Sequence, residues 1–491
     1  MDFEKFKELS TEYNLIPVYE IITADLLTPV LAYAKLRKNG VQSFLLESVQ
    51  GSLSMARYSF IGVDPEKIIL NKKNKIFEIN GKSWTEYIGN IFERLKQETE
   101  QIKQAHLAEL PQFTGGLVGF LGYENISLIE PVVHFDYPQK FKYDSNFGVY
   151  KTIIAFDHYK HQIILITNTS VNHQSNLEVI YQKAKECLKT LKRILLTDTI
   201  KIDSFKLLKS SAPEFENKQF FEVVEKSKEE IRAGEIFQIV LSKRFSNEYE
   251  GDLINVYRAL RIINPSPYMY FLENVDGFSI AGTSPEDLLR IQNRKATVLP
   301  IAGTRRRGKD EKEDIKLEED LLNDPKELAE HTMLVDLGRN DLGRVCKYGT
   351  VEVTEFMKIQ KYSHVMHIVS KVEGELKDNI HPIDALKSCF PAGTVSGAPK
   401  IRAMQLISKF ENEERNLYAG AVGYIDFSGN LDMCIAIRTL FAERGKIYWQ
   451  SGAGIVADSI PEKEALEIKN KSAVMLNALK YAEVIDENSG D

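Results

Sequence analysis

The stretch Ser451-Gly452-Ala453-Gly454-Ile455, followed closely by Ser459-Ile460-Pro461-Glu462, organises the C-terminal part of the chain. Its glycines predict a turn, and Pro461 suits the first turn of a helix that would begin there. Ser459 and Glu462 have the spacing of a capping box. We therefore expect a glycine-rich turn that leads straight into a capped helix and leaves backbone N–H groups of Gly452, Ala453 and Gly454 exposed.

Past that helix start, Glu464, Glu467 and Lys471 fall at positions i, i+3 and i+7, so they share one helical face. The exposed N–H groups would then lie close to two carboxylates and an ammonium group. This combination suits a substrate that carries carboxylates of its own and is held partly through a divalent metal. A solvated acidic helix after a surface turn is the other interpretation, and this run alone does not decide between the two.

The composition of the 491 residues is that of an ordinary globular protein, with 43% hydrophobic and 27% charged residues. A net charge of −7 favours neither a nucleic-acid partner nor an acidic membrane. The four cysteines show no metal-ligand spacing, no apolar run is long enough to span a membrane, and the first residues lack the apolar segment of a signal peptide. We therefore expect a cytoplasmic protein without nucleic-acid or membrane partners.

Hydrophobic periodicity predicts both long strands and amphipathic helices. Strands are expected over residues 44–48, 149–156, 236–242, 278–282, 296–302, 365–372 and 431–441. Helices are expected over residues 174–196, 218–233, 325–337 and 398–410. Because hairpin-like neighbours replace a regular alternation of strands and helices, the pattern favours an α+β fold in layers, with large mixed or antiparallel sheets packed by helices.

The polar segment 198–217 separates two parts of different texture. Beyond it, an amphipathic helix would end at Gly234, which is a typical helix terminator. We expect an N-terminal region over residues 1–205 and a second domain over residues 215–485, packed together into one body.

A first candidate catalytic side chain, Glu286, follows the predicted strand 278–282. The turn Gly282-Thr283-Ser284-Pro285 would aim it away from the sheet, where it could act as a general acid or base. The alternative is that Ser284 and Pro285 only start a helix, which is the commoner use of such residues.

A second carboxylate, Glu330, lies in the middle of the predicted helix 325–337. Its helical neighbours include apolar residues, so a half-buried Glu330 would need a partner such as Mg²⁺. The adjacent His331 points elsewhere and is no candidate. Two glycines within residues 336–344 predict the end of the helix and a turn.

Two further stretches could line a cleft. His367 lies in a predicted strand, where a lone histidine is usually a core residue and becomes of interest only if its face lines a cleft. Residues 391–400 form a turn that opens a helix, and its small residues, the Thr394 hydroxyl and free N–H groups suit an anion. A capped loop is the alternative for this turn.

Alternation along the predicted strand 431–441 puts Arg438 on a face of small residues. An arginine with that much room can grip a carboxylate with both of its forked N–H groups, and Tyr418 could assist it.

Taken together, these motifs resemble those of the chorismate-utilising enzymes, and most closely the large aminase subunits of anthranilate synthases. The resemblance covers nearly the whole chain, and the motifs occur in the family's order. They are residues 282–286, 300–305, 328–344, 365–367, 391–400, 438 and 451–471. The resemblance implies the layered fold of that family and a lyase that converts chorismate and ammonia into anthranilate and pyruvate, the first committed step of tryptophan biosynthesis.

The resemblance also implies a metal site. Glu330 and Glu467 match the ligands of a Mg²⁺ ion that holds the ring carboxylate of chorismate, and Glu464 and Lys471 flank that ion. Backbone N–H groups of residues 452–454 match further contacts to the same carboxylate.

Roles for the remaining side chains are implied in the same way. Glu286 matches the general acid that helps the C4 hydroxyl group leave, and His367 matches a catalytic histidine near the breaking bonds. Arg438 and Tyr418 match the grip on the enolpyruvyl carboxylate, and Thr394 lines the pocket.

Two positions separate the branches of this family. Ala302 stands where many aminodeoxychorismate synthases carry a nucleophilic lysine, and Gln238 stands where isochorismate and salicylate synthases carry a lysine that activates water. Neither residue can do that chemistry, so the resemblance implies that ammonia attacks C2 directly. Aminodeoxychorismate synthase component I, of the folate pathway, is the alternative that Ala302 disfavours.

Residues 45–48 and 264–270 resemble the tryptophan feedback site of the anthranilate synthase subunits, the former suiting the ammonium group of the inhibitor and the latter its indole ring. The residues expected to contact tryptophan are Glu47, Ser48, Pro267, Tyr268 and Met269. A strand and an ordinary turn are the alternative. Arg57 replaces a lysine expected in some relatives, and its role is open.

None of the four cysteines lies in the context of a glutaminase nucleophile. The resemblance therefore implies a separate glutamine amidotransferase subunit that supplies ammonia, in a heterotetramer of two large and two small subunits. Alone, the chain would use free ammonia.

Overall fold

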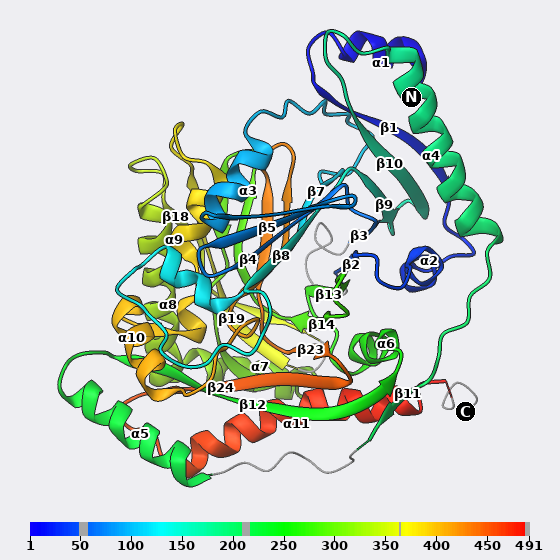
Figure 1. Cartoon of the computed structure of the whole chain (residues 1–491). Helices are drawn as coiled ribbons and strands as arrows, with labels where there is room; N and C mark the ends of the chain where they lie inside the picture. The colour runs from blue at the N-terminus through cyan, green and yellow to red at the C-terminus, as the bar shows by residue number, and fades with distance from the viewer. Residues whose placement is uncertain (49–56, 209–216, 363–364, 487–491) are drawn as a thin grey trace.

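The computed structural model describes residues 1–48, 57–208, 217–362 and 365–486 (Figure 1). Within these residues the strands form two sheets of twelve strands each. The named strands pair in antiparallel fashion throughout both sheets. Helices pack around the sheets, so the predicted α+β layered fold is confirmed.

The first sheet begins at the N-terminal end of the molecule. In spatial order it contains β1 (Leu15–Thr23), β10 (Gln162–Ser170), β9 (Thr152–Asp157), β3 (Tyr58–Val63), β2 (Ser43–Glu47), β13 (Tyr268–Glu273), β14 (Ser279–Ser284), β23 (Thr439–Glu443), β24 (Lys446–Ile455), β12 (Gln238–Gly251) and β11 (Phe205–Leu207), with β20 (Gly397–Ala398) paired to β12.

The second sheet packs beside the first. In spatial order it contains β17 (Ile301–Arg306), β19 (Val365–Glu375), β16 (Lys295–Val298), β15 (Asp287–Gln292), β22 (Leu431–Ile435), β21 (Ala421–Asp426), β7 (Gly116–Leu121), β8 (Ser145–Tyr150), β4 (Lys67–Lys72), β5 (Lys75–Asn80) and β6 (Ser83–Ile88), with β18 (Glu352–Lys361) paired to β19.

Both sheets combine strands from the N-terminal part of the chain with strands from the C-terminal part. The division into domains 1–205 and 215–485 stays a prediction, and residues 209–216 at its boundary lie outside the described residues.

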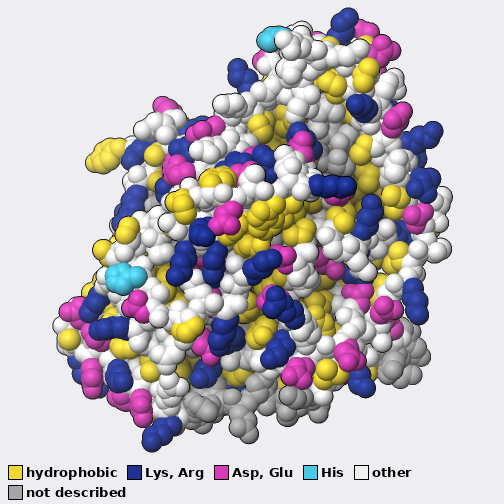
Figure 2. Space-filling view, viewed as in Figure 1, with side chains coloured by type: hydrophobic (Ala, Val, Ile, Leu, Met, Phe, Trp, Pro, Cys, Tyr) yellow, Lys and Arg dark blue, Asp and Glu magenta, His cyan; other side chains and the backbone are white. Residues whose placement is uncertain are grey.

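On the face seen in Figure 2, acidic and basic side chains are spread around a central group of hydrophobic ones.

The helices flank the two sheets, with α4 against β1 and β10 and α11 against β24 (Figure 1). They are α1 (Phe3–Leu9), α2 (Pro29–Leu36), α3 (Ile91–Thr99), α4 (Leu177–Thr197), α5 (Asn217–Arg232), α6 (Ile254–Ile263), α7 (Glu311–Leu322), α8 (Pro325–Gly343), α9 (Pro382–Cys389), α10 (Lys400–Phe410) and α11 (Pro461–Glu483), with 3₁₀ turns η1 (Tyr123–Leu128) and η2 (Gly393–Val395). Within the described ranges, none of the helices is long and apolar enough to cross a membrane.

The packing of α11 on β24 fixes the helix that carries the predicted acidic face. Trp449 of β24 is fully buried, stacks on Phe245 of β12 at 5.9 Å, and donates its indole N–H to Ser472 Oγ of α11 over 2.7 Å. Burying some 200 Å² of indole surface is worth roughly 5 kcal/mol at about 25 cal/mol per Å². Trp449 therefore holds both the position and the rotation of α11.

Within the described residues the chain passes from one sheet to the other six times: between β3 and β4, β8 and β9, β14 and β15, β19 and β20, β20 and β21, and β22 and β23. The single strands predicted over 149–156 and 431–441 are therefore wrong, because each is two strands that belong to different sheets. Lys151 separates the first pair, and residues 436–438 separate the second. A continuous apolar run does not show where a chain changes sheets, since both strands are buried.

Several predicted boundaries also change. The strand over 296–302 is two strands, β16 and β17. The helix predicted over 325–337 is too short, because α8 continues to Gly343 and tolerates Gly338 at about 1 kcal/mol; the helix end and turn predicted within 336–344 are confirmed at the last residues of that stretch. Gly234 does follow the end of α5, with a φ of 80°, as predicted.

The glycine-rich turn predicted over 451–455 is wrong as well. These residues continue β24, paired with β12 through the register Gly452↔Ser242 and Gly454↔Val240. The helix after them does begin at Pro461, but its N-cap residue is Ile460 and no side chain caps it, so the predicted capping box is wrong.

Candidate active site

A cavity of about 610 Å³ lies where the two sheets meet and where α8 and α11 approach them. Predicted site residues from widely separated parts of the sequence line it together. They are Gln238, Pro267, Glu286, Ala302, Glu330, His367, Thr394, Tyr418, Arg438, Gly452, Gly454, Glu464, Glu467 and Lys471. Ala453 is buried and does not line the cavity, because alternation along β24 turns its side chain to the other face.

Glu286 and Arg438 lie at two of the crossings between the sheets. Glu286 stands between β14 and β15, and Arg438 directly precedes β23. The crossings are joined to each other, because Ile435 N–H donates to Glu286 O over 3.0 Å and Thr283 N–H donates to Arg438 O over 3.1 Å. Leaving the sheets at these points turns both side chains into the cavity.

The backbone of Arg438 has a φ of 49°, which non-glycine residues rarely adopt. The prediction that strand alternation orients Arg438 is therefore wrong, although its side chain does reach the cavity. Its Nη1 donates to Asn264 Oδ1 over 3.4 Å. Burial lowers the pKa of this guanidinium, and the nearby carboxyl group of Glu286 opposes that shift.

Burial raises the pKa of Glu286 to about 7, against the lowering effects of Thr394, Arg438 and Lys471. Near neutral pH about half of these side chains therefore carry a proton. A carboxyl group poised in this way can deliver a proton to a leaving group.

His367, on β19, is held in one tautomer. Its Nδ1 lies 2.9 Å from the carbonyl oxygen of Gly303, which can only accept, so Nδ1 carries the proton and Nε2 keeps a lone pair. Burial lowers the pKa of His367, so the ring is neutral at pH 7. His331, which follows Glu330 in α8, points away from the cavity as expected, and its Nε2 lies 2.6 Å from Ser370 Oγ in the core.

Two helices contribute carboxylates to the wall of the cavity: α8 presents Glu330, and α11 presents Glu464 and Glu467. Burial raises the pKa of Glu330, and the charges of Glu327 and Glu467 raise it further. Burial followed by the charge of Glu467 also raises the pKa of Glu464, against the lowering effect of Ser459. Mutual repulsion of this kind is relieved by a bound cation.

Lys471 shares the face of α11 that carries Glu467, as predicted. Its Nζ lies 2.7 Å from Glu467 Oε1 and donates to Gly452 O over 3.1 Å. Within the described residues, no group of three or more histidine, cysteine, aspartate or glutamate side chains is close enough to surround a metal ion. The donor set instead fits an ion such as Mg²⁺, which takes one or two protein carboxylates and completes its shell with water and substrate oxygens.

The glycines of β24 leave room for side chains that approach them closely. A Cβ atom at Gly452 would lie 2.5 Å from the hydroxyl oxygen of Tyr418, and one at Gly454 would lie 2.5 Å from Nε2 of Gln238. Alternating small residues in an otherwise strand-like run were a signal for this arrangement, and the turn prediction overlooked it.

The sequence reasoning missed several lining residues, among them Lys326, Thr304, Tyr362 and Gln450. Lys326 could have been found, because it stands four residues before Glu330 and therefore on the same helical face. The others carried no signal, since only the folded chain brings them together.

A second cavity, of about 600 Å³, lies on the other side of segment 264–270. All five residues predicted to contact tryptophan line it: Glu47, Ser48, Pro267, Tyr268 and Met269. Pro267 lines both cavities. Arg57 is at the rim, where it pairs with Asp157 at 2.7 Å and stacks over Tyr58 at 4.8 Å.

The carboxylate of Glu47 is already engaged. It accepts from Tyr257 Oη over 2.5 Å and lies 3.0 Å from Nε of Arg261. Among the described residues, its Oε1 atom makes long contacts, of 3.4 Å to Arg261 and 3.5 Å to Ser59, which leave it suited to accept a stronger donor.

Comparisons with known proteins agree with this geometry. The protein described as anthranilate synthase component 1 of Acetivibrio thermocellus is 44% identical over 489 residues, covering 98% of both chains. That of Aquifex aeolicus is 42% identical, again covering 98% of both chains. The crystal structure of anthranilate synthase component I from Streptococcus pneumoniae is 37% identical, with a TM-score of 0.74, and covers 93% of this chain and 99% of that one.

The menaquinone-specific isochorismate synthase of Escherichia coli shares the fold at 18% identity, with a TM-score of 0.69 and coverage of 97% and 98% of the two chains. The family described as chorismate binding enzyme matches residues 42–477, which include both cavities. This chain belongs to the chorismate binding enzyme family.

Proposed function

We propose that this chain is the large component of an anthranilate synthase, which converts chorismate and ammonia into anthranilate, pyruvate and water. One observation carries the proposal: a single cavity joins a carboxyl group with a pKa of about 7, a neutral histidine, a buried guanidinium, and the carboxyl groups of Glu330 and Glu464, whose pKa values are raised. Identities of 42–44% to proteins named anthranilate synthase component 1, over nearly the full length, support it.

Chorismate carries two carboxylates, and the cavity offers two different partners for them. Arg438 and Tyr418 are suited to the enolpyruvyl carboxylate, because a buried guanidinium and a phenol both donate hydrogen bonds to it. Glu330 and Glu467 would hold Mg²⁺, with Glu464 and Lys471 beside them. When bound, the ion supplies a positive charge that accepts the ring carboxylate against this acidic wall.

The first chemical step replaces a hydroxyl group by an amine. Ammonia forms a bond to C2, the two ring double bonds shift to C1–C6 and C4–C5, and the C4–O bond breaks. The new ammonium group on C2 gives one proton to solvent. Glu286 donates its proton to the departing oxygen, which leaves as water. Because burial holds the pKa of Glu286 near 7, the proton is available at neutral pH.

The second step makes the ring aromatic. The proton on C2 is removed, the C3–O bond breaks, and the enolpyruvyl group leaves and is protonated to pyruvate. His367 is suited to accept the C2 proton at Nε2, since the Gly303 carbonyl keeps its other nitrogen protonated. Ala302 and Gln238 both line the cavity, and neither can act as nucleophile or base in place of ammonia.

Ammonia would come from glutamine through a separate amidotransferase subunit, in a heterotetramer of two subunits of each kind. The component 1 in the names of the relatives supports the existence of a partner component. We also propose that the second cavity binds L-tryptophan as a feedback inhibitor, with its ammonium group near Glu47 and Ser48 and its indole near Pro267, Tyr268 and Met269.

The test is an assay with chorismate, ammonium and Mg²⁺ that follows anthranilate fluorescence with and without tryptophan. We expect a fluorescent product that requires Mg²⁺ and is suppressed by tryptophan; a 4-amino product instead would overturn the proposal in favour of an aminodeoxychorismate synthase. Glu330→Gln should lower the rate roughly 10²- to 10³-fold, since the metal contributes several kcal/mol. Glu327→Gln, one turn earlier on α8 and outside the cavity lining, is the matched control and should keep the activity.

A further inference from the structure

A fully buried arginine behind the catalytic cavity, Arg415, connects several parts of its wall. It lies between α10 and β21, has no exposed surface, and does not itself line the cavity. None of the chemistry proposed for the cavity uses it. A guanidinium removed from water must form hydrogen bonds in compensation, so its partners indicate what it holds in place.

Two of these partners are backbone carbonyls of the cavity wall. Nη1 of Arg415 donates to Val395 O over 2.8 Å, and Nη2 donates to Val240 O over 2.7 Å. Val395 belongs to the turn η2 beside Thr394, and Val240 lies on β12. Both valines line the cavity, so one guanidinium sets the spacing between two of its walls.

The third partner is an aromatic ring of the cavity. The guanidinium carbon of Arg415 lies 5.6 Å from the ring centroid of Tyr418. It also lies 4.8 Å from the ring centroid of Tyr123. Burial raises the pKa of the Tyr418 phenol, and the positive charge of Arg415 acts in the opposite direction. Tyr418 is one of the two side chains proposed to grip the enolpyruvyl carboxylate.

A carboxylate completes the arrangement. Glu411 accepts from Nε of Arg415 at Oε2 and from Nη2 at Oε1, each over 2.7 Å. Oε1 also accepts from the backbone N–H and the hydroxyl group of Ser242, both over 2.8 Å. The hydroxyl of Ser242 accepts from Gln450, which lines the cavity. The ion pair of Arg415 and Glu411 is thus connected to β24 through the side chains of Ser242 and Gln450.

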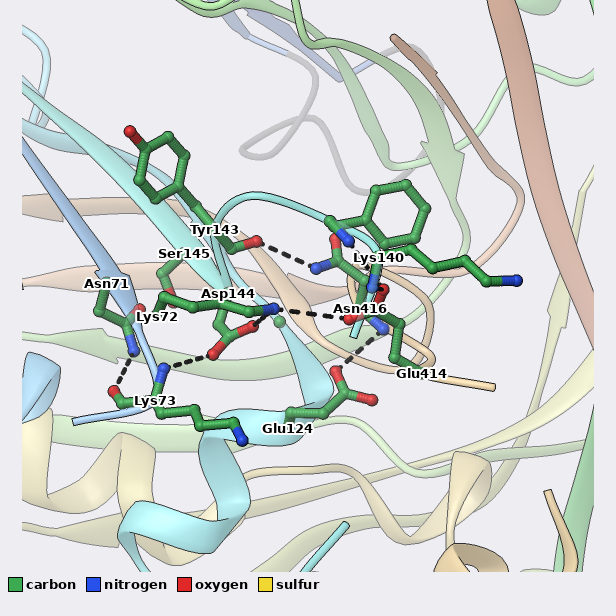
Figure 3. A network of polar contacts seen from close by, with 12 residues as sticks. Asn71, Lys72, Lys73, Glu124, Lys140, Tyr143, Asp144, Ser145, Glu414 and Asn416 are labelled. Carbon is green, nitrogen blue, oxygen red and sulfur yellow. Dashed lines mark hydrogen bonds and ion pairs between the residues drawn. The ribbon is translucent and has the colours of Figure 1, made fainter. Parts of the chain in front are cut away.

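The backbone on either side of Arg415 is anchored independently, as Figure 3 shows for its neighbours Glu414 and Asn416. The carboxylate of Glu124 accepts from the N–H groups of Arg415 and Asn416 over 2.7 and 3.0 Å, and Glu414 Oε1 accepts from the Phe141 N–H over 2.8 Å. The side chain therefore projects from a fixed base, which is a requirement for positioning.

We propose that Arg415 is a positioning residue for chorismate binding, which acts by holding Tyr418 and the backbone of Val240 and Val395 at fixed distances. This inference rests on the proposed function for the identity of the ligand. Lysine in its place keeps the charge but lacks the planar fork, so it cannot serve Glu411 and both carbonyls at once. The backbone of Val240 and Val395 would then no longer be held at a fixed spacing, even in a protein that stays folded.

The test compares Arg415→Lys with Arg94→Lys. Arg94 is a matched control, because it is 12% exposed, pairs with Glu98 at the same i,i+4 spacing, and lies outside the cavity lining. We expect both variants to lower Tm, but only Arg415→Lys to raise the KM for chorismate, by tenfold or more, and to weaken equilibrium binding of chorismate in the absence of ammonia to the same degree.

If Arg415→Lys lowers Tm while KM and binding match those of Arg94→Lys, the role of Arg415 is merely structural and the inference is wrong. If Arg415→Lys does not fold, Glu411→Gln tests the same contact, because it weakens the hydrogen bonds to the Arg415 guanidinium with almost no change of shape. This variant should raise KM by a smaller factor, and an unchanged KM would also contradict the inference. Failure of the unmodified protein to bind chorismate would instead contradict the proposed function.

Discussion

The two cavities have nearly the same volume, about 610 and 600 Å³, yet their charges are arranged in opposite ways. In the catalytic cavity no ion pair joins Glu330 or Glu464 to a basic group of the described residues, and both carboxyl groups have raised pKa values. In the second cavity Glu47 pairs with Arg261, and Asp432 accepts from Tyr268 over 2.9 Å.

This difference is the one expected between the proposed site for chemistry and the proposed site for tryptophan recognition. Unneutralised carboxylates cost free energy in the empty protein, and a cation or a proton that arrives with the substrate recovers it. Paired charges around aromatic rings instead give a preformed pocket for a zwitterion with a flat apolar side chain. The comparison therefore predicts that substitutions in one cavity leave the function of the other intact.

The largest effect should come from Glu286→Gln. Loss of a general acid typically costs 10²- to 10⁴-fold in rate, and we expect a fall of about that size in anthranilate formation, measured by steady-state kinetics. Tryptophan binding, measured by calorimetry, should be unchanged. Asp287→Asn is the control, because this neighbouring carboxyl group is also buried with a pKa raised to about 7 but lies outside the cavity lining. Equal losses in both variants would contradict a specific role for Glu286.

A smaller effect is expected from Arg438→Lys, which keeps the charge but loses the forked pair of donors. Hydrogen bonds to charged groups are worth about 1.5–3 kcal/mol, so KM for chorismate should rise roughly 10- to 100-fold. The measurement is KM against kcat at saturating ammonium. A fall in kcat with unchanged KM would mean that Arg438 does not hold the substrate in its ground state.

In the second cavity, Glu47→Gln should weaken inhibition by tryptophan about tenfold, since one charge-assisted hydrogen bond to the ammonium group becomes neutral. Uninhibited activity should stay the same. Glu109→Gln is the control, because Glu109 lines the same cavity but accepts from Tyr19 over 2.6 Å. Loss of activity in Glu47→Gln without a change in inhibition would remove the distinction between the two cavities.

The smallest effect concerns pH. Glu286 must be protonated to act as an acid and its pKa is raised to about 7, so the rate should fall as pH rises through 7 and approach a tenfold loss per pH unit well above it. The raised pKa of Glu330 should act on the other limb, because protonation at low pH would compete with the Mg²⁺ proposed to bind there. Glu286→Gln should lose the alkaline limb alone. An alkaline limb that persists in this variant would assign it to another group.

Much of the site could be predicted from sequence, because each motif pairs a reactive side chain with a local feature that positions it. Glu464, Glu467 and Lys471 depend only on helical periodicity, which holds in α11. Glu286 depends on a chain that leaves a sheet, which its turn residues indicate. The layered fold followed from the same periodicity.

The errors have a common physical cause. Periodicity reports burial and carries no information about which sheet a strand joins, so 149–156 and 431–441 were each read as one strand. The face of Arg438 followed from that error, since its positive φ arises only at the crossing. The glycines of β24 were read as a turn because the side chains of Tyr418 and Gln238 that occupy the space above them come from distant parts of the chain.

The six crossings between the sheets within the described residues also bear on how the molecule unfolds. Each crossing joins a strand of one sheet to a strand of the other. Glu286 and Arg438, which line the cavity, lie at two of these crossings. We therefore expect neither sheet to unfold alone, and a ligand bound at the crossings should stabilise both sheets together. The proposed active site thus lies where the unfolding of one sheet should be linked to the unfolding of the other.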